Sequence, residues 1–238
     1  MMLAFFTASV NVDTLSYMFY RDNGLVMVLL GCFFIMSFVL SRSRKLLFQL
    51  MSGFLMNRKR TSIFTTSTVS EVNYLLLLVL VSCVLMGTCI YCLCVQQVPM
   101  LIAHVDPSLL LGIYIGGTIV YLLLKWLSYL FIGWIFFGKE QTMFWIESYL
   151  VLIYYSCFYL FPLSLILVFV SPSFPVGFTL FILLLVMIRL CIFYKWIQLF
   201  SVNLYGLFHF FLYFCALEIT PCILLGASTL VINNLLTI

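Results

Sequence analysis

Charged side chains are scarce in this sequence of 238 residues, which has only 7 Asp and Glu and 11 Lys and Arg. Charged residues make up 8% of the chain, whereas hydrophobic residues make up 66%. This composition leaves too little polar surface to cover a water-soluble globule of this length. The sequence therefore argues against a soluble fold and predicts a protein whose solvent is the lipid bilayer.

Polar interruptions of the apolar runs are also rare. Runs of roughly 20 residues or more recur along the chain, and this is the length that crosses about 30 Å of hydrocarbon. Strand-like alternation is lacking, and a helical span satisfies its own backbone hydrogen bonds in lipid. We therefore expect one all-α, polytopic transmembrane domain over residues 1–238, with about six spans. These spans are Gly24–Leu40, Val72–Val95, Ser108–Gly138, Thr142–Val170, Val176–Ile197 and Leu204–Ile232.

Lys and Arg are missing from the loops at 96–107 and 171–175 and gather on the other side of the expected bundle. Cytoplasmic flanks hold the excess of Lys and Arg, so we expect both termini to lie outside. Residues 41–71 are expected to form a basic cytoplasmic loop whose short apolar segment lies along anionic lipid headgroups. The basic residues of this loop are Arg42, Arg44, Lys45, Arg58, Lys59 and Arg60.

The third expected span, Ser108–Gly138, is long and contains Lys125. As one helix it would measure about 46 Å. It either tilts strongly, or it bends near Lys125 and finishes along the inner surface. In the second case Lys125 extends to the headgroups instead of lying inside the bundle.

Four ionisable residues interrupt the expected spans: Lys125, Glu147, Arg189 and Glu218. A charge at such a position costs roughly 2.5–3.5 kcal/mol on insertion scales and normally faces the protein interior. Counted from the expected inner ends, Lys125 and Glu218 lie on the order of 20 Å deep, and Glu147 and Arg189 on the order of 8–13 Å deep. The sequence predicts these two pairs, which either fix helix register or form an ion site.

The sixth expected span contains Glu218 three residues before Pro221, and His209 near its inner end. Pro221 removes the amide that would bond the carbonyl of Leu217, as in the broken helices of transporters. His209 has no second histidine at its level, because His104 lies in an outer loop. We therefore expect no metal site and no cofactor, and a hydrogen bond at the interface for His209.

Cys89 and Cys92 form a CxxC spacing near the outer end of the second expected span. Thiol–disulfide exchange is one interpretation of this spacing. No second cysteine pair is found in an outer loop, and most of the nine cysteines lie in apolar runs as small hydrophobic residues. No zinc-hydrolase, nucleotide-loop or Ser/His motif occurs in the sequence.

The C-terminal half resembles a known family through three elements. They are Lys125-Trp-Leu with Gly133–Phe137, the Phe161-Pro162-Leu element, and Phe208–Pro221, which reads FHFFLYFCALEITP. These elements, within Leu109–Leu225, resemble an uncharacterised inner-membrane family of Bacteroidota known as a domain of unknown function. The first two spans add nothing to this resemblance. It implies a polytopic protein of the inner membrane in a Gram-negative cell, and it implies no activity.

Three functions are compatible with these observations. The leading expectation is a non-enzymatic subunit or accessory factor of a larger assembly in the bacterial inner membrane, with other membrane proteins and no nucleic acid as partners. The second is a small secondary transporter or channel that uses Glu218 and Lys125. The third is a membrane thiol–disulfide redox protein that uses Cys89 and Cys92.

Overall fold

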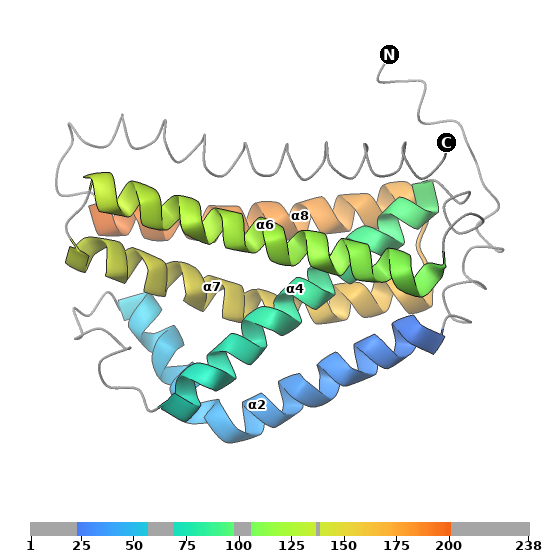
Figure 1. Cartoon of the computed structure of the whole chain (residues 1–238), viewed down its shortest axis with the longest axis horizontal. Helices are drawn as coiled ribbons and strands as arrows, with labels where there is room; N and C mark the ends of the chain where they lie inside the picture. The colour runs from blue at the N-terminus through green and yellow to red at the C-terminus, as the bar shows by residue number, and fades with distance from the viewer. Residues whose placement is uncertain (1–22, 57–68, 98–105, 137–138, 201–238) are drawn as a thin grey trace, which may run out of the picture.

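The computed structural model describes residues 23–56, 69–97, 106–136 and 139–200, and all of its regular structure is helical (Figure 1). Within these ranges, five helices are long and apolar enough to cross a membrane. This confirms the expectation of an all-α, multi-pass membrane protein. The sixth expected span, Leu204–Ile232, lies outside the described residues. The helices are α2 (Asn23–Met56), α4 (Val69–Gln97), α6 (Pro107–Phe136), α7 (Lys139–Leu165) and α8 (Phe174–Phe200), with a short π-helix, η2 (Ile166–Val170), after α7.

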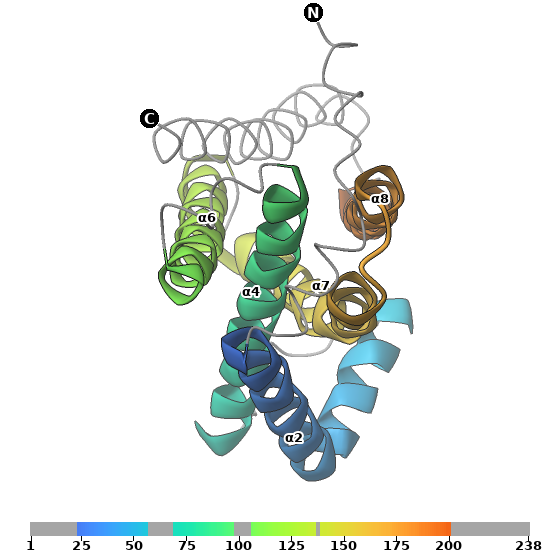
Figure 2. The same cartoon turned by 90° about the vertical axis from the view of Figure 1, so that its right-hand side faces the viewer.

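Helix α2 continues beyond the point where the sequence suggested a loop. Its apolar part ends at Arg44, but the helix runs on to Met56 across a kink at Ser43, whose φ and ψ of −114° and 20° are not helical. The Ser43 hydroxyl donates a hydrogen bond to the carbonyl of Val39 at 3.0 Å. The first part of the expected 41–71 loop is therefore a bent helix that changes direction at the basic cluster (Figure 2).

Helix α4 is the centre of the bundle. It packs against α2, α6, α7 and α8, and Figure 2 shows it between α6 on one side and α7 on the other. In its apolar segment 67% of the residues are buried, compared with 17–28% in α2, α6 and α8. None of these helices has a polar face in its sequence. The side of each helix that contacts α4 is therefore the side that faces the protein interior, and the remaining sides face lipid.

Helices α4 and α6 approach each other very closely at Gly87. A Cβ atom at this position would lie 2.8 Å from the Cα of Ile115, so only glycine accommodates the present separation. One turn away, the Thr118 hydroxyl donates a hydrogen bond to the carbonyl of Cys83 at 2.9 Å. Small residues and an interhelical hydrogen bond are the usual means by which helices associate in lipid.

Helix α6 runs without interruption from Pro107 to Phe136, through Lys125. The carbonyl of Asp106 accepts the backbone N–H groups of Leu109 and Leu110, and Pro107 occupies the first helical position, where no N–H is needed. Of the two sequence alternatives, the bend near Lys125 is wrong. The 30 residues form one helix of about 45 Å.

Helix α7 contains Pro162, which has no N–H to offer the carbonyl of Phe158 one turn earlier. Four residues later the helix widens into η2, which ends where the N–H of Ser171 bonds the carbonyl of Ile166 at 3.2 Å. Ser171 has a left-handed φ of 39°, and this reverses the chain into α8. The regular hydrogen bonding of α7 is therefore interrupted from Pro162 to the end of η2.

Successive long helices run in opposite directions. Figure 1 shows that the last turn of α6, the first turn of α7 and the end of α8 lie at one end of the bundle, while the connection between α7 and α8 lies at the other. Helix α7 begins with Lys139 at the first of these ends. This alternation is the arrangement that consecutive membrane spans require.

Replacing Gly87 by alanine will destabilise the protein, because the new methyl group meets the backbone of Ile115 as well as its side chain, and backbone cannot move aside. We expect a loss of about 1–3 kcal/mol, the usual cost of overpacking. Gly117→Ala on α6 is the matched control, since nothing lies within 4 Å of a Cβ at that position. Thermal unfolding in mild detergent measures both variants, and equal melting temperatures would contradict the close helix approach.

Candidate functional site

Two positively charged side chains each contact a tyrosine on a neighbouring helix, among α6, α7 and α8. The Nη2 atom of Arg189, on α8, donates a hydrogen bond to the Tyr121 hydroxyl of α6 at 2.9 Å. The Nζ atom of Lys125, on α6, lies 5.2 Å from the ring centroid of Tyr149 on α7. Tyr121 and Lys125 are four residues apart and thus lie on one face of α6. We call these four residues the two-cation cluster.

The cluster lies at one level of the bundle. Lys125 is eleven residues before the end of α6 at Phe136, and Arg189 is eleven residues before the end of α8 at Phe200. Both positions are therefore about 16 Å from helix ends that lie on the same side of the molecule (Figure 1). The sequence predicted different depths for the two cations, because its inner ends for spans three and five, Gly138 and Ile197, lie two residues after the end of α6 and three residues before the end of α8.

Both cations are directed toward other helices. Lys125 is only 2% exposed, so its ammonium does not extend to the headgroups, and Arg189 is half-buried. A cation over an aromatic ring gains about 0.5–2 kcal/mol. A hydrogen bond to a charged group contributes about 1.5–3 kcal/mol. Contacts of this size offset much of the cost of keeping a charge inside lipid.

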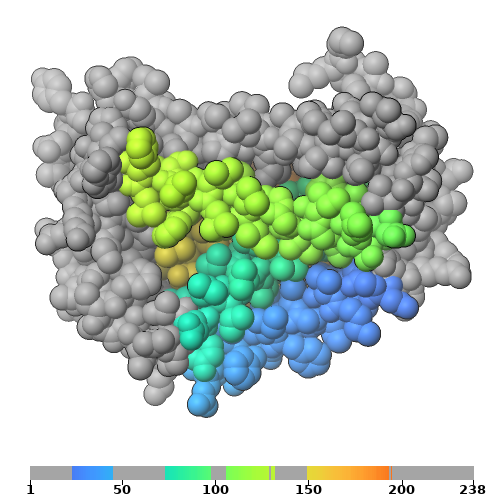
Figure 3. Space-filling view, viewed as in Figure 1, coloured from blue at the N-terminus to red at the C-terminus, as the bar shows by residue number. Residues whose placement is uncertain are grey.

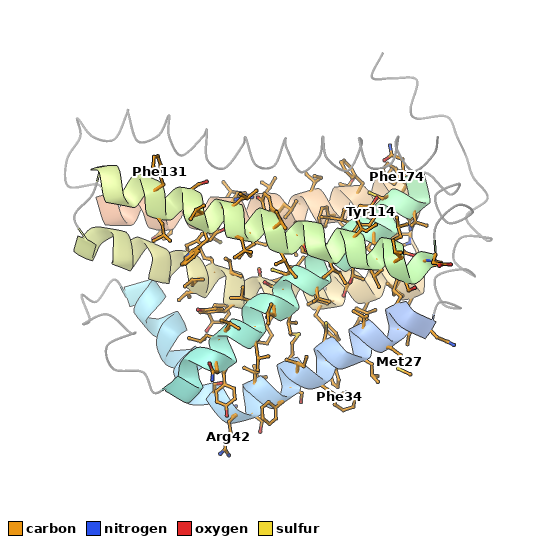
Figure 4. All side chains as sticks on the ribbon, in the orientation of Figure 1. Met27, Phe34, Arg42, Tyr114, Phe131 and Phe174 are labelled. Atoms are coloured by element: carbon orange, nitrogen blue, oxygen red, sulfur yellow. The ribbon has the colours of Figure 1, made fainter. Side chains whose placement is uncertain are left out.

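The remaining predicted residues are only partly described. Glu147 belongs to α7, but its side chain lies outside the described residues, as do Lys45 and the residues His209, Glu218, Pro221, Arg58, Lys59 and Arg60. The two predicted ion pairs therefore stay predictions. Arg42 and Arg44 are exposed on either side of the α2 kink, and Figure 4 shows Arg42 pointing away from the bundle.

Neither Tyr121 nor Tyr149 was singled out from the sequence. The four-residue spacing from Tyr121 to Lys125 is the one local signal that could have identified the first. The partner helix of each tyrosine depends on how α6, α7 and α8 are rotated, and hydropathy carries no information on rotation.

Cys89 and Cys92 lie one turn apart on α4, both are 0% exposed, and neither is in a disulfide. The neighbouring Tyr91 packs edge-to-face on Tyr114 of α6, with 6.3 Å between ring centroids. The CxxC spacing is thus in the packed interior of the bundle. In the described part of the chain, no three His, Cys, Asp or Glu residues are grouped for metal binding.

Tyr121→Phe removes the oxygen that accepts the Arg189 hydrogen bond while it retains the ring. We expect a loss of about 1.5–3 kcal/mol in unfolding free energy, because the bond involves a charged donor. Tyr159→Phe is the control, since Tyr159 is 60% exposed. If the two variants melt at the same temperature in mild detergent, the contact between α6 and α8 contributes nothing to stability.

No curated protein and no solved structure matches this chain. The family described as "Domain of unknown function (DUF4271)" matches residues 25–228. The sequence resemblance was expected over Leu109–Leu225 alone, and this limit was wrong, because the match also includes α2 and α4. Since it covers most of the sequence and all five described helices, the chain belongs to the DUF4271 family of domains of unknown function.

Proposed function

We propose that this chain is a non-enzymatic subunit or accessory factor of a larger assembly in the bacterial inner membrane. The observation that carries this proposal is that both intramembrane cations contact side chains of neighbouring helices. Arg189 joins α8 to α6 through Tyr121, and Lys125 joins α6 to α7 through Tyr149. Polar groups that are costly in lipid thereby hold neighbouring helices in one arrangement, as a structural component requires.

The surface of the bundle supports the same function. Helices α2, α6 and α8 are mostly exposed, and their exposed side chains are large and apolar. Figure 3 shows α2 and α6 spread over one face of the molecule. Among their side chains, Phe34 of α2 and Leu124 of α6 are about 60% exposed. In a membrane, such a face contacts lipid or the helices of other proteins.

The basic end of the bundle supports a cytoplasmic orientation for residues 41–71. Arg42 and Arg44 are exposed at the α2 kink, and they are available to anionic headgroups at about 1 kcal/mol for each charge. In this proposal the N-terminus lies outside, and a sixth span brings the C-terminus to the outside as well. Other membrane proteins and anionic lipids are the partners.

Purification of the tagged chain from its native membrane in mild detergent tests the assembly. We expect the chain to elute in a complex larger than its own micelle and to carry a defined set of membrane proteins. A tagged, unrelated multi-pass protein of the same membrane is the control for nonspecific capture. A chain that elutes alone, with only the proteins found in the control, contradicts the proposal.

A second candidate function is a small transporter or channel. It is favoured by the interrupted end of α7, where Pro162 leaves the carbonyl of Phe158 without its usual helical donor and η2 widens the helix. Broken helices with free carbonyls coordinate ions in transporters. Lys125 and Glu218 would supply the charged groups of this candidate. Elution of a solitary chain in the purification above would favour this function.

The third candidate, a thiol–disulfide protein, receives no support from the positions of Cys89 and Cys92. Thiol exchange needs an attacking thiolate that a partner can reach. Both side chains are fully buried between helices, and neither is in a disulfide.

A further inference from the structure

One side of α2 carries an arginine at the end of a row of exposed apolar side chains. Met27, Phe34 and Phe38 are 69%, 62% and 59% exposed, and the exposed Arg42 follows Phe38 by one turn. Residues four or seven apart share a side of a helix. Figure 4 shows Met27, Phe34 and Arg42 pointing away from the bundle on the same side of α2. We call these four residues the α2 stripe.

The α2 stripe borders α4 near the α2 kink. The ring of Phe38 packs edge-to-face on the ring of Tyr74 of α4, with 6.1 Å between centroids. Tyr74 is half-buried and lies five residues after the start of α4 at Val69, while Phe38 lies five residues before the kink at Ser43. Side chains on a helix lean toward its N-terminus, so the Tyr74 hydroxyl is directed toward the end of the bundle at which Arg42 lies.

Arg42 belongs to the side of α2 that faces α4, and Arg44 does not. Phe33 stacks on Phe161 of α7 while Phe38 contacts α4, so these two phenylalanines mark the two flanks of α2. Arg42 comes one turn after Phe38, whereas Arg44 comes about three turns after Phe33. The two exposed arginines are thus on opposite flanks of α2, and only Arg42 continues the α2 stripe.

We propose that the α2 stripe and Tyr74 form a binding site for one anionic phospholipid. The guanidinium of Arg42 and the hydroxyl of Tyr74 donate hydrogen bonds to the headgroup phosphate. One acyl chain lies along Phe38, Phe34 and Met27. This site deepens the anionic-lipid contact of the proposed function and rests on that part of it, and it does not depend on whether other membrane proteins bind.

The dimensions of the α2 stripe fit a lipid of one leaflet. Met27 lies eleven residues before Phe38, which is about 16 Å along the helix axis. The hydrocarbon core of a bilayer is about 30 Å thick, so one acyl chain extends over about half of this distance. Arg42 lies about 6 Å beyond Phe38 and is therefore at the level of the headgroup when the chain lies along the stripe.

The charge at the end of the α2 stripe favours an anionic lipid. A planar guanidinium binds phosphate oxygens through two parallel hydrogen bonds. In phosphatidylethanolamine the ammonium group of the headgroup offsets the phosphate charge, whereas phosphatidylglycerol keeps its negative charge. We therefore expect a preference of roughly five-fold for phosphatidylglycerol, which corresponds to about 1 kcal/mol for one interfacial arginine.

Native mass spectrometry of the full chain, purified in mild detergent and titrated with phosphatidylglycerol, tests the site. Phosphatidylethanolamine with the same acyl chains is the reference lipid. Arg42→Gln should lower the affinity for phosphatidylglycerol roughly five-fold and remove the preference over the reference lipid. Tyr74→Phe should lower this affinity roughly two-fold or more, because it removes a hydrogen bond and keeps the ring that contacts Phe38.

Arg44→Gln is the matched control, because it removes an exposed positive charge that lies outside the α2 stripe. It should leave the affinity for phosphatidylglycerol unchanged. Equal losses in Arg42→Gln and Arg44→Gln would overturn the site and leave only the general attraction of the basic end to anionic lipid. Equal affinities of the unaltered chain for the two lipids would overturn the site and the anionic-lipid partner together.

Glycerol 3-phosphate separates a lipid site from a site for a soluble anion, because it carries the phosphate without acyl chains. We expect no displacement of bound phosphatidylglycerol by glycerol 3-phosphate, since the soluble molecule lacks the contacts with the phenylalanines of the α2 stripe. Displacement at equal concentrations of the two molecules would overturn the proposal.

Discussion

Two positive charges inside an apolar bundle constrain how the second half of this protein is arranged. The bilayer core offers no water to an ammonium or a guanidinium, so Lys125 and Arg189 must be turned toward protein. Lys125 reaches the ring of Tyr149 and Arg189 reaches the hydroxyl of Tyr121. These contacts fix the rotation of α6 about its axis, because Tyr121 and Lys125 lie on one face of that helix. They also fix which residues of α7 and α8 face that side of α6.

The first half of the protein depends on close packing. Helix α4 is mostly buried, and at Gly87 its backbone approaches that of α6 so closely that a methyl group has no room. Apolar side chains contact lipid as favourably as they contact each other. Short-range dispersion contacts and hydrogen bonds such as that from Thr118 to Cys83 must therefore make helix association more favourable than contact with lipid. The bundle thus has a tightly packed centre at α4, and the contacts of Lys125 and Arg189 with tyrosines join the helices toward α8.

Hydropathy predicted the parts of the structure that depend on the length of apolar runs. Four of the five described spans were expected within a few residues of their observed helices, and Pro162 was expected inside the fourth. The exception is α2, which continues to Met56, well beyond the expected end at Leu40. Features that depend on rotation or on local backbone geometry were missed. The kink at Ser43 follows an ordinary helical sequence, and the π-helix begins four residues after the proline that weakens the helix. The tyrosine partners of the two cations required knowledge of which helix faces meet.

Membership of a family of unknown function leaves the role of this chain to be inferred from its physical properties. The proposed role as a structural subunit depends on three of these properties: exposed apolar helices, a basic end, and intramembrane charges that join neighbouring helices. They also account for the strong asymmetry between α4, which is shielded from lipid, and α8, which is mostly exposed.

The central claim is that the helices cross the membrane alternately, with the basic end in the cytoplasm. Reporter fusions test it most directly, with green fluorescent protein and alkaline phosphatase each fused after Arg60, Ala103, Gly138 and Pro172. The account predicts fluorescence without phosphatase activity at Arg60 and Gly138, and phosphatase activity without fluorescence at Ala103 and Pro172. The reverse pattern, or the same reporter active at all four positions, would contradict it.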